Sequence, residues 1–88
     1  MGLFSKKVKV DYDALFKEQY KSINQLMMQV HNESDYVIKE SLLEVVVKKY
    51  DELIEYIDQG VAQDKQHFVS LKEDVIKELE MIRNINKD

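Results

Sequence analysis

The residues best suited to chemistry are the only two histidines, His31 and His67. Metal sites and acid–base centres need such groups clustered with further ligands or partners. His31 lies at the end of the first expected helix and His67 near the start of the third. In a chain that folds back on itself they are about 20–30 Å apart, at 1.5 Å rise per residue. We therefore expect no metal site: His31 interacts with the carbonyl end of its helix, and His67 is solvated.

Acidic residues are plentiful, and several pairs lie one helical turn apart. A di-metal helical bundle needs inward-facing Glu and Glu-x-x-His motifs on facing helices, and the chain has no such motif. We expect these acids on solvated faces, because carboxylates rarely enter a core. The pairs are Glu40 with Glu44, Asp51 with Glu55, and Asp74 with Glu78. Lys49 falls within an apolar stripe, and we expect its ammonium group to reach solvent past the edge of the core.

Nucleophilic catalysis is equally unsupported. There is no cysteine, and a serine nucleophile needs a partner base. No phosphate-binding loop, nucleophile elbow or zincin motif occurs. The sequence therefore predicts a protein that is not an enzyme and has no cofactor, metal or small-molecule substrate. The serines without a well-placed histidine are Ser5, Ser22, Ser34, Ser41 and Ser70.

Composition points to one small folded domain. The 88 residues are 44% hydrophobic and 34% charged, which is normal for a globular protein. The absence of cysteine excludes disulfides and fits a cytoplasmic protein. No apolar run approaches the roughly 20 residues that span a bilayer. The net charge is −4, and an acidic body opposes nucleic-acid binding.

Residues 1–10 read as a flexible basic arm that precedes a domain at 11–88. Three lysines give the arm a charge of +3 and leave −7 for the rest of the chain. The start is too short and too charged for a signal peptide, and Lys6 stands where myristoylation needs Ser or Thr. The arm is either a solubilising tail or a weak membrane contact worth about 3 kcal/mol at most. The candidate membrane contacts are Leu3, Phe4, Lys6, Lys7 and Lys9.

The elements that carry these residues are helices. Proline is absent, glycine occurs only at Gly2 and Gly60, and apolar residues recur at steps of three and four. This pattern predicts an all-α protein. We expect three helices, with a polar break at 32–35 and a left-handed terminus at Gly60. Their predicted ranges are 12–31, 35–59 and 64–86.

Asp64 is the expected cap of the third helix, although Ser70 with Glu73 forms a capping box and offers a later start. Short connections make successive helices antiparallel neighbours, so we expect an antiparallel up-down-up three-helix bundle. The alternative is a long helical hairpin, in which one break is continuous helix. Such a hairpin needs a partner to bury its faces.

The second helix is more apolar than two neighbours require. Its apolar residues cover about 200° of the circumference at 100° per residue. One stripe consists of Ile38, Leu42, Val45, Val46, Leu53, Tyr56 and Ile57. The stripe beside it consists of Tyr36, Leu43, Val47, Tyr50 and Ile54.

We expect this second stripe to form a partner interface, most simply in a homodimer. The alternative is that long side chains of the neighbouring helices hide it. The sequence thus predicts a small cytoplasmic interaction module that binds a second copy, and another protein in addition. The alternative function is a peripheral membrane protein, or a small regulatory or immunity-type protein, that uses the basic arm.

Overall fold

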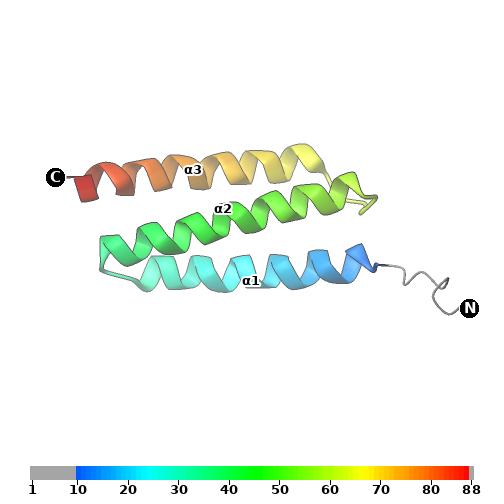
Figure 1. The fold of residues 1–88 in the computed structure, drawn as a ribbon, viewed down its shortest axis with the longest axis horizontal. Coiled ribbons are helices and arrows are strands. Elements are labelled where there is room, and N and C mark those ends of the chain that lie inside the picture. Colours follow the sequence, from blue (N-terminus) through cyan, green and yellow to red (C-terminus); the bar gives the residue numbers. More distant parts are fainter. Residues whose placement is uncertain (1–9, 88) are drawn as a thin grey trace, which may run out of the picture.

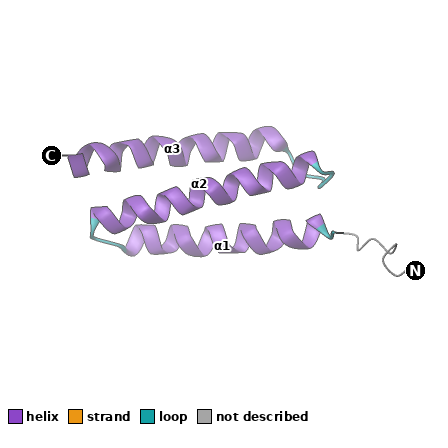
Figure 2. Cartoon of the chain, in the orientation of Figure 1, coloured by secondary structure: helices purple, strands orange, loops and turns teal. Residues whose placement is uncertain are grey.

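The computed structural model describes residues 10–87, and this range contains three helices and no strand (Figure 2). Helix α1 spans Tyr12–Asn32, α2 spans Tyr36–Asp58 and α3 spans Lys65–Lys87. The predicted all-α fold with three helices is therefore confirmed, and each helix end agrees with its prediction to within one residue. Residues 1–9, with the five candidate membrane contacts Leu3, Phe4, Lys6, Lys7 and Lys9, lie outside the described range.

Each helix begins at an aspartate whose side chain accepts hydrogen bonds from the first backbone N–H groups. Asp11 accepts from the N–H of Ala14 at 3.0 Å, and Asp35 accepts from the N–H of Val37 at 2.9 Å. Asp64 accepts from the first turn of α3 at 3.1 Å and 3.4 Å. These bonds satisfy N–H groups that have no partner within the helix. Asp64, and not the Ser70 capping box, therefore starts the third helix.

Gly60 ends α2 through its backbone conformation. Its φ of 119° is open to glycine and strained for other residues. The N–H of Gly60 donates to the carbonyl of Ile57 at 2.9 Å, and the N–H of Val61 donates to the carbonyl of Tyr56 at 3.1 Å. These two bonds form a Schellman motif, which commonly includes an apolar contact from the residue after the glycine. Val61 is buried accordingly, and the chain reverses into α3.

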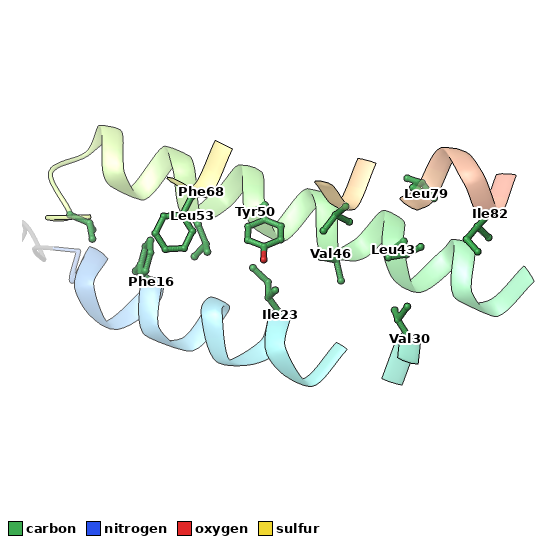
Figure 3. Packing of buried hydrophobic residues seen from close by; sticks show 12 residues of the cluster. Phe16, Ile23, Val30, Leu43, Val46, Tyr50, Leu53, Phe68, Leu79 and Ile82 are labelled. Atoms are coloured by element: carbon green, nitrogen blue, oxygen red, sulfur yellow. The ribbon is translucent and has the colours of Figure 1, made fainter. Parts of the chain in front are cut away.

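The core is a single line of buried side chains along the three helices (Figure 3). In α1 the buried residues recur every seven positions, in α2 at steps of three, four and three, and in α3 at steps of seven, four and three. This spacing keeps one narrow face of each helix turned inward. The buried positions are 16, 23 and 30 in α1; 43, 46, 50 and 53 in α2; and 68, 75, 79 and 82 in α3.

Helix α2 lies between the other two, and the chain direction alternates from helix to helix in Figure 1. Both α1 and α3 pack closely on α2, but within the described residues no Cα atom of α1 comes within 8 Å of one in α3. Aromatic rings connect these outer helices. Phe68 of α3 meets Phe16 edge-on at 5.2 Å and Tyr20 at 5.8 Å between ring centroids.

The break at residues 33–35 also has a packing reason. If α1 and α2 were one straight helix, 100° per residue would place Val30 and Leu43 about 140° apart around it. Both side chains are fully buried in the same core. A continuous helix would turn one of them away from that core, so the chain must interrupt the helix and fold back. The alternative of one continuous helix through residues 32–35 is therefore wrong.

Candidate interaction surface

The structure corrects the predicted partner interface at two positions. Leu43 is 0% exposed and Tyr50 is 6% exposed, so both belong to the core of this chain. Val47 and Ile54 are half-buried and pack against that core. Tyr36 remains 43% exposed at the start of α2, where the Lys39 ammonium group lies 5.4 Å from its ring centroid. The second stripe is thus largely covered by the chain itself.

The physical reason is the central position of α2. Its buried line takes Leu43 and Tyr50 from one predicted stripe and Val46 and Leu53 from the other. Neither stripe is wholly buried and neither is wholly exposed, because the buried line of α2 runs along the boundary between the two stripes. Helix α3 covers one flank, where Val47 lines a shallow depression together with α3 residues. Helix α1 covers the other.

The apolar surface that remains exposed lies on the opposite side of α2. Val37 is 64% exposed, Ile38 46% and Val45 42%, and Ser41 lies exposed between them. At 100° per residue these four side chains occupy an arc of about 100°, centred roughly opposite the buried line. We call Val37, Ile38, Ser41 and Val45 the outer strip of α2. The sequence pattern places Ile38 and Val45 in the first apolar stripe and Val37 in neither stripe.

The neighbouring half of α1 carries no formal charge. Residues 22–32 include no Asp, Glu, Lys or Arg, although 34% of the whole chain is charged. Contacts of Gln19 with Lys49 and of Tyr12 with Tyr56 set the register between α1 and α2. This register places the uncharged half of α1 beside residues 36–46, which include the outer strip. Exposed apolar side chains beside a surface poor in charge are typical of protein interfaces.

The residues able to do chemistry are dispersed. His31 is exposed in the last turn of α1, while His67 is exposed in the first turn of α3. Figure 1 shows these helix ends at opposite ends of the molecule. Among residues 10–87 no group of three His, Cys, Asp or Glu side chains could hold a metal ion.

Three of the six carboxylates in the expected pairs contact another helix. Arg83 of α3 donates to Glu44 at 2.7 Å and to Glu40 at 3.4 Å on α2. The hydrogen bond that Arg83 donates to the Glu44 carboxylate is the main reason that the pKa of Arg83 is raised. Asp51 forms an ion pair with Lys72 of α3. Exposed pairs of this kind contribute about 0–1 kcal/mol each, so they orient α3 more than they stabilise it.

Lys49 has a partner that sequence analysis did not identify. Its Nζ atom donates a hydrogen bond to Oε1 of Gln19 on α1 at 2.9 Å. The aliphatic stem lies half-buried along the α1–α2 contact, as expected for a long side chain that extends past a core. The ammonium group is therefore engaged in positioning two helices.

Tyr50 couples the stability of the fold to pH. Burial raises its pKa above the ordinary value of 10.0, and the nearby Tyr20 raises it further. The folded state thus retains the phenol proton more tightly than the unfolded chain. This contribution to stability is complete below about pH 10, the pKa of an unperturbed tyrosine, and is lost as pH rises through the folded pKa.

We expect Tyr50→Phe to flatten the fall in unfolding free energy between pH 9 and 11, because phenylalanine has no proton to lose. Urea denaturation at steps of pH measures this slope for each variant. Tyr36→Phe is the matched control, since it removes an exposed hydroxyl group. Equal slopes for Tyr50→Phe and wild type would show that Tyr50 does not set the alkaline limit.

Comparison with known proteins identifies no relative. No protein-family model matches the chain, and no curated protein or solved structure is significantly similar to it. Between residues 10 and 87, no helix has an apolar stretch long enough to cross a bilayer.

Proposed function

We propose that the protein is a non-enzymatic interaction module, an antiparallel up-down-up three-helix bundle that pairs with a second copy. The paired surface is the outer strip of α2 together with the uncharged half of α1. A cytoplasmic location belongs to the same hypothesis. The proposal retains the predicted self-association through the second helix but transfers it from Leu43 and Tyr50 to the opposite side of that helix.

One observation carries this proposal. Three of the nine large apolar side chains that are exposed between residues 10 and 87 belong to the outer strip of α2. Single exposed apolar residues are common on monomeric proteins, but a group beside a charge-free surface is not. Burying that surface against an identical one removes apolar area from water without burying an unpaired charge.

The test is the molecular mass in solution, measured by light scattering after gel filtration at about 1–100 µM, a range that detects weak dimers. We expect wild type to approach twice the 10.5 kDa mass of one chain. Val37→Lys with Val45→Lys places two charges at the centre of the interface and weakens pairing at least tenfold, about 1.4 kcal/mol.

The matched control is Met81→Lys, which changes a side chain on α3 that is 63% exposed but lies outside the outer strip. We expect this variant to pair like wild type. A wild-type mass of 10.5 kDa at every concentration would overturn the proposal. So would equal pairing by the double variant and wild type.

A further inference from the structure

Three of the four residues of the outer strip are arranged symmetrically along α2. Val37 and Val45 lie four residues before and after Ser41. At 100° per residue they lie about 40° to either side of it. A twofold axis perpendicular to the helix at Ser41 therefore places Val37 of one copy opposite Val45 of the other. An interface between identical surfaces requires this kind of self-complementarity.

Charge distinguishes antiparallel from parallel pairing. Lys48 lies exposed just beyond one end of the outer strip, and Glu33 and Asp35 lie before the other end. In parallel pairing Lys48 would face Lys48 of the second copy, and like charges repel. Antiparallel pairing instead places Lys48 close to the acidic residues of the partner. Within residues 10–87 Lys48 forms no ion pair, so it is available for this contact.

Side-chain size agrees with an axis at Ser41. Packed helices lie 8–10 Å apart, and Cα atoms lie about 2.3 Å from the helix axis. Residues that face each other on the twofold axis thus have Cα atoms about 3.4–5.4 Å apart, which leaves room only for small side chains. Serine is the smallest residue of the outer strip.

We propose that two copies pair through antiparallel α2 helices, with the twofold axis at Ser41. This inference rests on the proposed dimer and adds its orientation and register. Val37 packs on the partner's Val45 in two equivalent places, Ser41 meets its own copy, and Lys48 approaches the acidic start of the partner's α2.

Disulfide trapping tests the register directly, because the chain contains no cysteine. A disulfide forms where Cα atoms lie about 4.4–6.8 Å apart. We expect Ser41→Cys to form covalent dimers under mild oxidation, read on a non-reducing gel. Val37→Cys and Val45→Cys should each cross-link weakly alone and at least fivefold more when mixed. Met81→Cys is the control: its cysteine is exposed on α3 outside the outer strip, so it measures the cross-linking that random collisions produce.

The outcomes separate the orientation from the function. If wild type is dimeric but Ser41→Cys cross-links no faster than Met81→Cys, the twofold axis at Ser41 is wrong and the dimer stands. Strong cross-linking of Val37→Cys alone and of Val45→Cys alone would replace this register with a parallel one. A monomeric wild type overturns both the register and the proposed function.

Discussion

Replacing Phe68 by alanine lowers the free energy of unfolding by about 3–5 kcal/mol, the usual range for a buried aromatic residue. Phe68 is buried, and its ring meets Phe16 and Tyr20 edge-on. The backbones of α1 and α3 stay apart within the described residues, and this aromatic cluster connects them through side chains. We expect this loss to remove a large fraction of the total stability, because domains are stable by only about 5–15 kcal/mol.

Urea denaturation followed by circular dichroism at 222 nm measures this loss. His67→Ala is the matched control, because the His67 ring also touches Phe68, at 5.1 Å, but is exposed. We expect the control to change stability by less than about 0.5 kcal/mol, as surface substitutions usually do. Similar losses for both variants would show that the ring cluster does not connect α1 and α3.

Replacing Leu43 by alanine lowers the free energy of unfolding by about 2–5 kcal/mol. Leu43 has no exposed surface and lies among Val30 of α1 and Leu79 and Ile82 of α3 (Figure 3). Alanine leaves a cavity in this group, and the loss of transfer free energy adds to the cost of the cavity. The effect is expected in the monomer, since every contact made by the side chain lies within one chain.

Concentration separates this core role from an interface role. Dimer formation makes apparent stability rise with protein concentration, so urea curves are compared at two concentrations. We expect the loss caused by Leu43→Ala to be the same at both. Val37→Ala, at a position 64% exposed, is the control and costs less than about 0.5 kcal/mol in the monomer. A loss of unfolding free energy that appears only at high protein concentration would show that Leu43 acts in the dimer interface.

The sequence indicates that the second helix carries extra apolar surface, but it does not indicate which of its residues are exposed. The apolar pattern of the second helix predicts surplus apolar surface at Tyr36, Leu43, Val47, Tyr50 and Ile54, whereas the structure buries Leu43 and Tyr50 and exposes the outer strip. The uncharged run at 22–32 was a usable signal, because it marks a part of α1 that does not need solvation. Together with Val37, which falls outside both predicted stripes, it indicates the exposed side of α2.

Helix ends were determined locally. The aspartate caps, the polar break at 32–35 and Gly60 act through their own backbone and a few neighbouring residues, so the sequence alone was sufficient to predict the three helices. Only the tertiary structure decided which part of the apolar arc of α2 is buried. Periodicity measures the width of an apolar arc, but it does not specify the angles at which two neighbouring helices approach it. Those angles depend on the packing of side chains such as Phe16 and Phe68, which meet across 52 positions of sequence.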